Sequence, residues 1–328
     1  MKYYRLPVLI SLALCLALPV FSIAEQNDAA FLAWLKAFQS DAHSQGLSKK
    51  TLEQGFSEIK VPLAEVIERD SSQPEMTQSV DDYLASRVSS QRIKSGRRMM
   101  RRYPTWLGRV ERTYQVQRRY LVALWGVESH YGEHTGTYPV LQSLATLAYD
   151  GRRSGYFRKE LIEALRLIDD GIVPQHTMRG SWAGAMGQCQ FMPSSVRHYA
   201  VDEDSSGSIN LWRSVPDVLG SIANYLAKAG WRYDQTWGRE VVLPQNFDHA
   251  LVGLETRHPL SRWQALGVRR INGRALPKRD LQASLIMPDG TNGRAYLVYD
   301  NFRVLLKWNR SSRFAIAVGA LSDQLRGL

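Results

Sequence analysis

A run without a single polar side chain, Leu121–Val127, is followed directly by Glu128. A helix that is apolar on every side has to be buried, so this stretch predicts a central helix with a carboxyl group at its end. Loss of hydration would raise the pKa of that carboxyl, and a carboxyl that keeps its proton near neutral pH can act as a general acid. The structural alternative is a rim residue paired with an arginine, because ion pairs also perturb pKa values.

The N-terminal segment, residues 1–24, has the pattern of a secretory signal peptide. A basic start and an apolar stretch, Leu6–Phe21, precede the small-x-small cleavage pattern Ser22-Ile23-Ala24. We therefore predict export and a periplasmic mature chain, and no later segment is long enough to span a membrane. Cys15 follows a leucine that is too bulky for a usual lipobox, so we do not expect lipoprotein anchoring.

The chain is strongly basic, with a formal net charge of +11 over 328 residues, and its 44% hydrophobic content is enough for a folded core. The densest basic cluster consists of Arg92, Lys94, Arg97, Arg98, Arg101, Arg102, Arg109, Arg112, Arg118 and Arg119. In an exported protein such a cluster would attract wall-peptide carboxylates or anionic lipids at the wall or membrane, not nucleic acid. A solvated helix face is the alternative. We expect a monomer, and the lone mature cysteine, Cys189, is expected to be a buried small side chain.

Apolar spacing predicts a chain made mostly of helices. The expected helices cover 29–43, 48–52, 81–102, 106–117, 141–150, 156–169, 217–228 and 314–325. Residues 61–74 are expected to form an irregular connection. The β-like runs are 238–244, 281–287 and 293–299, and 302–309 fits either a strand or the start of a helix. A small-residue stretch, 179–195, would let backbones approach closely.

The loop that begins at Asp202 resembles a calcium-binding loop. Acidic residues occupy its positions one and three, and a glycine occupies position six. Serine stands at position five, and Arg213 replaces the usual glutamate at position twelve. An Asx-rich turn without a metal is the alternative. The candidate structural Ca²⁺ ligands are Asp202, Asp204, Ser206, Ser208 and Asp217.

The segment His130–His134 matches the H-x-x-E-H spacing of some zinc peptidases. Such a site needs both histidines on one continuous helix and a distant third ligand. Gly132 and Gly136 indicate that the helix ends here instead. A zinc peptidase remains the alternative enzyme class.

In combination, these segments resemble the lytic murein transglycosylase B family, in a soluble form. The resemblance covers nearly the whole mature chain in order. It is carried by Gly126–Ser129 with Tyr131-Gly132, Leu144–Leu147, Gly180–Ser195, Ile209–Trp212, Ser221–Leu226, Asn301-Phe302 and Trp308–Ser311.

The resemblance implies a mainly α fold. A helical region and a lysozyme-like catalytic core would occupy residues 25–238, a small β-containing C-terminal insertion 239–300, and a segment that packs back on the core 301–328. It implies cleavage between N-acetylmuramic acid and N-acetylglucosamine of peptidoglycan glycan strands, with no cofactor required. Glu128 would protonate the leaving oxygen and then take a proton from the muramic C6 hydroxyl, which closes a 1,6-anhydro ring.

The same resemblance implies a set of substrate-binding residues, namely Tyr83, Ser181, Gln190, Tyr225 and Asn309. A second catalytic carboxylate is not needed, because the substrate supplies its own nucleophile, in contrast to two-carboxylate glycosidases. The sequence departs from the family pattern at Trp308, where tyrosine is frequent, and at Gln188 and Cys189, which replace residues that are commonly tyrosine and glycine. A wall-binding protein without catalytic activity is the second hypothesis.

Overall fold

The computed structural model describes residues 23–71 and 78–327. The helices are α1 (Ile23–Ser44), α2 (Lys49–Phe56), α3 (Ala64–Ser71), α4 (Val80–Arg87), α5 (Ser90–Arg102), α6 (Pro104–Tyr114), α7 (Arg118–Ser129), α8 (Val140–Asp150), α9 (Ser154–Asp169), α10 (Pro193–Tyr199), α11 (Val215–Lys228), α12 (Leu260–Ala265), α13 (Asp300–Trp308) and α14 (Ser312–Gln324), with 3₁₀ turns η2 (Gln175–Thr177) and η3 (His249–Leu251). The strands are β1 (Tyr138–Pro139), β2 (Arg179–Gly180), β3 (Gly238–Val242), β4 (His258–Pro259), β5 (Arg269–Arg270), β6 (Gln282–Ile286) and β7 (Ala295–Val298). The mainly α fold class is confirmed. The predicted signal peptide lies almost wholly outside the described residues.

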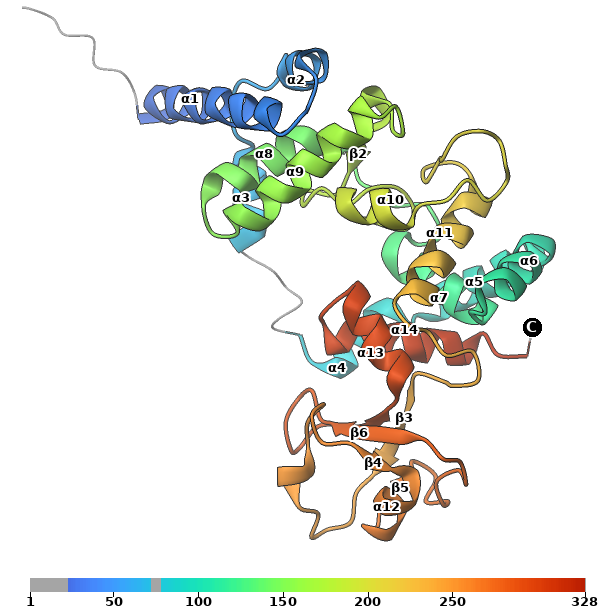
Figure 1. Ribbon diagram of the computed structural model, residues 1–328. Helices are drawn as coiled ribbons and strands as arrows, with labels where there is room; N and C mark the ends of the chain where they lie inside the picture. Colours follow the sequence, from blue (N-terminus) through green and yellow to red (C-terminus); the bar gives the residue numbers. More distant parts are fainter. Residues whose placement is uncertain (1–22, 72–77, 328) are drawn as a thin grey trace, which may run out of the picture.

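The central helix is α7, and every residue from Tyr120 to Val127 on it is buried. Helices α5, α11 and α14 pack against it, so the apolar run is enclosed as its sequence predicts. Figure 1 shows α14, from the C-terminal end of the chain, lying beside α7. The C-terminal segment thus packs against the helix that carries Glu128.

Two of the expected elements are wrong in the region before α7. Residues 61–74 are not wholly irregular, because Ala64–Ser71 forms α3 with Val66 buried against the core. The expected single helix over 81–102 is divided into α4 and α5. Ser89 lies in an extended conformation between them. Its hydroxyl accepts a hydrogen bond from the backbone N–H of Arg92, and this cap marks the start of α5.

Strands β1 and β2 pair with each other among the helices, and strands β3 to β7 form a second sheet below the helices in Figure 1. The strand order of this five-stranded sheet is β4-β6-β7-β3-β5, and every pair is antiparallel. Trp263 from α12 is fully buried in a separate apolar core under this sheet. The chain returns to the helical part through α13. Of the two structures expected for residues 302–309, strand or helix, the helix is therefore the one observed.

Candidate active site

Glu128 lies in the last turn of α7, half-buried, immediately before a sharp change of chain direction. His130 and Tyr131 both have left-handed backbone conformations, with φ of 52° and 63°. Such conformations are unfavourable for residues with side chains, so surrounding contacts must hold them. The Ser129 hydroxyl donates to the carbonyl of Gln188 at 2.6 Å and accepts from the backbone N–H of Gly132 at 3.0 Å.

Tyr131 folds back over α7 and fixes the turn from the other side. Its hydroxyl donates to the carbonyl of Arg92 at 2.8 Å. A Cβ atom at Gly126 would lie 2.6 Å from the Tyr131 ring, so this position on α7 needs glycine for close approach. The turn that presents Glu128 is therefore anchored to α5 on one side and to the small-residue segment on the other.

Trp308 connects Glu128 to a pocket. Its indole N–H, at the end of α13, donates a short hydrogen bond to Glu128 Oε1. The Trp308 ring packs against Tyr225 and Phe191, with centroid distances of 4.8 Å and 5.2 Å. These rings form part of the wall of a pocket of about 690 Å³, whose lining residues are Arg153, Tyr156, Glu160, Gln190, Phe191, Met192, Ser194, Ser195, Tyr225, Lys307, Trp308, Asn309 and Arg310.

Three of the residues expected to bind substrate line this pocket. The Tyr225 hydroxyl donates to the carbonyl of Lys307 at 2.7 Å, and burial raises its pKa to about 12, so it stays protonated. Gln190 uses its amide nitrogen for two backbone carbonyls, at 2.8 and 3.1 Å. The side-chain oxygen of Asn309 accepts from the backbone of Ser311 at 2.9 Å.

The other two expected residues lie elsewhere. Ser181 is half-buried in the turn after β2, where its hydroxyl accepts from the backbone N–H of Ala185 at 3.1 Å, and it is not among the pocket lining. Tyr83 is only 2% exposed, and the guanidinium of Arg87 lies 5.4 Å from its ring centre. Tyr83 lies on α4, which packs against α14, and it is not among the residues that line the pocket.

Between β2 and α10, from Ser181 to Met192, the small-residue segment is a tight loop. Isolated bridges pair Gly180 with Met186 and Met186 with Phe191. Gln188 accepts the indole N–H of Trp125 at 2.9 Å and donates to the carbonyl of Trp212 at 2.8 Å. Cys189 is fully buried, and burial, followed by the nearby charge of Glu128, raises the pKa of its thiol. A protonated, buried thiol is not a nucleophile.

Glu128 is not itself among the residues that line the pocket. Glu160 on α9 is a carboxylate that does line it, and sequence reasoning missed this residue. It is 5% exposed. One of its oxygens accepts the Ser194 hydroxyl at 2.7 Å and the other accepts the Ser194 backbone N–H at 3.0 Å. Glu160 therefore binds the first turn of α10, where a negative charge stabilises the helix. The apolar spacing of α9 predicts that Glu160 faces the core, but it does not predict that Ser194 is its hydrogen-bond partner.

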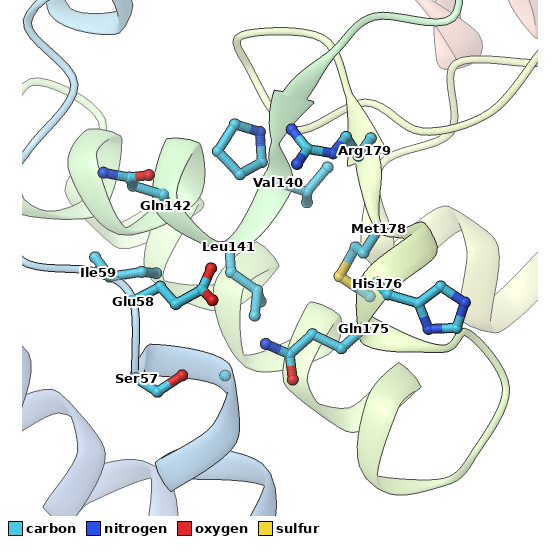
Figure 2. Close-up of a pocket in the computed structure, with 12 residues that line it drawn as sticks. Ser57, Glu58, Ile59, Val140, Leu141, Gln142, Gln175, His176, Met178 and Arg179 are labelled. Atoms are coloured by element: carbon cyan, nitrogen blue, oxygen red, sulfur yellow. The ribbon is translucent and has the colours of Figure 1, made fainter.

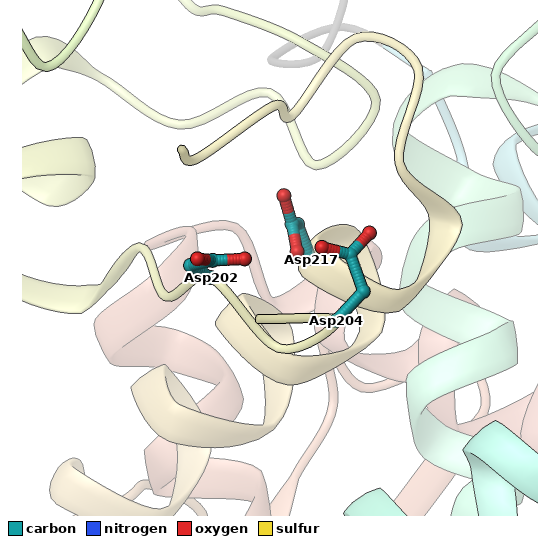
Figure 3. Close-up of side chains that lie close together, drawn as sticks. All are labelled: Asp202, Asp204 and Asp217. Atoms are coloured by element: carbon teal, nitrogen blue, oxygen red, sulfur yellow. The ribbon is translucent and has the colours of Figure 1, made fainter. Parts of the chain in front are cut away.

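The loop at Asp202 brings three of the five candidate calcium ligands together (Figure 3). One carboxylate oxygen from each of Asp202, Asp204 and Asp217 lies within 4.8 Å of the others. Asp217 is fully buried, and burial raises the pKa of its carboxyl. Its two oxygens accept backbone N–H groups of Glu203 and Asn210 at 2.9 and 2.8 Å, which closes the loop.

The remaining calcium candidates contribute to the loop in another way. The backbone N–H of Ser206 donates to Asp202 at 2.9 Å, and the hydroxyl of Ser206 donates to the carbonyl of Ser208 at 3.2 Å. Ser214 donates to Asp204 at 2.7 Å, which lowers the pKa of that carboxyl. Oxygen donors and converging charges fit a hard cation such as Ca²⁺. The exposed Arg213 side chain is not part of this cluster.

The zinc interpretation of His130–His134 does not fit the backbone. Because α7 ends at Ser129, the two histidines do not share a helical turn. The imidazole of His130 lies 3.4 Å from the carboxylate of Glu133 instead. Across residues 23–71 and 78–327, only Asp202, Asp204 and Asp217 form a cluster of potential metal ligands.

A separate pocket of about 400 Å³ lies between α2, α8 and the segment 175–179 (Figure 2). Glu58, Gln175 and Arg179 are among its polar lining residues, and Leu141 contributes apolar surface. It contains none of the residues expected to bind substrate. The other pocket is the candidate active site, because Trp308 lines it and donates a hydrogen bond to Glu128.

Comparison with known proteins identifies the family to which this chain is similar. Residues 30–323 match the transglycosylase SLT domain family. The chain belongs to this family. The membrane-bound lytic murein transglycosylase B of Escherichia coli K12 is 34% identical over 252 residues, which cover 74% of this chain and 66% of that protein. The chain thus spans just under two thirds of that relative's length.

Solved structures of this transglycosylase group are also similar. SltB3 from Pseudomonas aeruginosa in complex with NAG-anhNAM-pentapeptide has 44% identity and a TM-score of 0.85, with 90% of this chain and 80% of that chain covered. The E. coli lytic transglycosylase Slt35 in complex with calcium has 28% identity and a TM-score of 0.76, with coverage of 89% and 92%. In the part of the chain described here, no helix is long and apolar enough to cross a membrane.

Proposed function

We propose that this chain is a periplasmic lytic transglycosylase that cleaves the β-1,4 bond between N-acetylmuramic acid and N-acetylglucosamine in peptidoglycan and leaves a 1,6-anhydromuramic acid end. The observation that carries the proposal is the position of Glu128, at the end of the buried helix α7 and hydrogen-bonded to the pocket residue Trp308. Membership of the transglycosylase family supports it.

In the proposed reaction, protonated Glu128 gives its proton to the glycosidic oxygen as the bond to muramic C1 breaks. The resulting carboxylate then removes the proton of the muramic C6 hydroxyl, and that oxygen forms a bond to C1. Glu128 thereby regains the proton that it gave up in the first step, and no water is consumed. The indole N–H of Trp308 favours the carboxylate form that exists between the two steps.

The side chains around the pocket fit a sugar polymer. Gln190, Asn309 and the Tyr225 hydroxyl supply polar groups, while Trp308 and Phe191 supply aromatic surface. Ligand sites commonly combine apolar walls with a few placed polar groups in this way. Tyr83 and Ser181, which lie outside this lining, are proposed as supporting residues that hold the surrounding helices and loop.

The environment of Glu160 supports ring closure over hydrolysis, because a two-carboxylate hydrolase needs a second carboxylate to activate water. Both of its oxygens accept hydrogen bonds from Ser194, and its side chain is buried. A carboxylate used in this way is poorly placed to bind and deprotonate a water molecule. We therefore assign Glu160 to holding α10 and not to the chemistry.

Product analysis tests the proposal. Digestion of purified murein should give fragments with anhydro ends by mass spectrometry, whereas reducing-end muramic acid would identify a hydrolase. Glu128→Gln should abolish cleavage and leave murein binding intact. Glu160→Gln serves as the matched control, because it neutralises the carboxylate that lines the pocket and should still give anhydro ends. Cleavage that survives Glu128→Gln would exclude Glu128 as the acid.

A wall-binding protein without activity predicts a different outcome. In that case the wild-type chain would bind murein without releasing any fragment, and Glu128→Gln would change nothing. The candidate calcium loop has a structural role in either case, and we propose Asp202, Asp204 and Asp217 as its main ligands. Calcium in the structure of the similar E. coli protein supports this assignment.

A further inference from the structure

From Lys94 to its C-terminal end, the exposed side of α5 is entirely basic. Each exposed position from Lys94 to Arg102 is a lysine or an arginine, whereas Ser95, Gly96, Met99 and Met100 form the buried side of the helix. We call the exposed set the α5 basic face, and it consists of Lys94, Arg97, Arg98, Arg101 and Arg102. No acidic residue occurs in α5 to offset these charges.

These cations have no acidic partner within the described parts of the chain, although arginines elsewhere on the surface commonly do. The ion-paired arginines are Arg69, Arg109, Arg118, Arg119, Arg152, Arg153, Arg158, Arg166, Arg197, Arg232, Arg257, Arg279, Arg294, Arg313 and Arg326. Within the α5 basic face, Arg97 donates only to the carbonyl of Gln324 at 3.1 Å, and Arg102 lies over the ring of Tyr103. The face therefore carries uncompensated positive charge.

The α5 basic face also has a shape that can receive an anion. Lys94, Arg97 and Arg101 line a depression of about 490 Å³ together with Ser90, Ile93 and Gln324. Figure 1 shows α5 next to α6 at one side of the molecule, close to the C-terminal end. The pocket beside Trp308 shares no lining residue with this depression, so both can be occupied at once.

We propose that the α5 basic face docks the protein on a bilayer surface that contains anionic phospholipids. From Lys94 to Arg102 the helix rises by about 12 Å, so the five cations require several anions side by side. Headgroup phosphates in the plane of a bilayer supply them, and guanidinium groups bind phosphate oxygens in pairs. Ile93 is the only apolar side chain in the depression, so binding is electrostatic and peripheral, without insertion.

Vesicle sedimentation with the full-length mature chain tests this proposal. The protein should bind vesicles of phosphatidylglycerol and phosphatidylcholine, should not bind pure phosphatidylcholine, and should dissociate as salt shortens the screening length. The triple variant Lys94→Gln, Arg98→Gln, Arg101→Gln changes side chains without hydrogen-bond partners among the described residues. Each cation near the surface contributes about fivefold, so we expect the partition coefficient of this triple variant to fall about a hundredfold.

A second triple variant separates this face from overall charge. Lys49, Lys50 and Lys60 are exposed, make no ion pair in the described structure and lie on the N-terminal helical part. Changing all three to glutamine removes the same charge and should leave vesicle binding nearly intact. Equal losses in both variants would overturn the proposal, as would equal binding to neutral vesicles. A triple α5 variant that loses binding to purified murein but not to vesicles would assign the face to the wall instead. Circular dichroism melts confirm that both variants are folded.

Discussion

Replacing Trp308 with phenylalanine tests the connection between the pocket and Glu128. The change removes the indole N–H that Glu128 Oε1 accepts, and it keeps an aromatic ring against Tyr225 and Phe191. A donor of this kind favours the ionised form of a carboxyl group. Without it, Glu128 should keep its proton to a higher pH, and the carboxylate formed in the first step should be less stable.

The size of this effect follows from the kind of bond that is lost. A hydrogen bond to a charged group contributes about 1.5–3 kcal/mol. Glu128 is half-buried, so solvent replaces part of the lost bond, and we take the lower end, about 1.5 kcal/mol. At 1.36 kcal/mol per pH unit, the alkaline limb of kcat/KM should move upward by about one unit. The same energy, lost in the transition state, lowers the maximal rate by about tenfold.

The assay is the pH dependence of kcat/KM on purified glycan strands, whose alkaline limb reports the acid of the free enzyme. Trp231→Phe is the matched control. It removes an indole N–H that donates to Gln117 at 2.8 Å, next to the opposite end of α7. The control should leave the alkaline limb in place. An unmoved limb in Trp308→Phe, or the same shift in both variants, would refute the role of the Trp308 donor.

Two other predictions concern stability. Calcium at about one hundred times its Kd should raise the free energy of unfolding by about 2.7 kcal/mol, measured as an increase in Tm over chelator-treated protein. Burial raises the pKa of Asp217, so protons compete with calcium for this carboxylate at a higher pH than for an ordinary aspartate. The calcium-dependent increase in Tm should therefore become smaller as the pH falls. If the Asp202→Asn variant keeps the full calcium-dependent increase, calcium does not bind in this loop. Gly126→Ala places a Cβ atom 2.6 Å from the Tyr131 ring and should cost about 1–3 kcal/mol. Gly155→Ala, in α9 with open space around it, should gain up to about 1 kcal/mol, and equal Tm values for the two variants would contradict the close contact.

The fold was predictable where local pattern and tertiary packing agree. The apolar run on α7 has only one way to avoid water, and the structure encloses it. The break between α4 and α5 was missed because the apolar spacing continues through it. Ser89 is the signal that could have revealed the break, since a serine in an extended conformation starts a new helix by capping it. Serine also occurs inside helices, so a serine at this position does not by itself show that a helix ends there.

The site was predictable in part for a related reason. Gln190, Tyr225 and Asn309 come from distant parts of the sequence, and no local pattern brings them together. The family resemblance named them, and the structure lines one pocket with all three. Glu160 could not be found in this way, because its function depends on the turn at Ser194, which only the fold places beside it. Burial of Tyr83 is likewise a consequence of how α4 packs against α14.

The departure at Trp308 is informative about the proton path. A tyrosine hydroxyl, which the family resemblance leads us to expect at this position, can donate or accept a hydrogen bond, whereas an indole N–H can only donate. In this chain the indole that donates to Glu128 therefore cannot take up a proton from it. In the proposed mechanism it can stabilise the carboxylate while the leaving sugar departs, and it carries neither of the two protons. This restriction agrees with one carboxyl acting first as acid and then as base, and it makes Trp308→Tyr a more conservative change than Trp308→Phe, because the hydroxyl restores a donor.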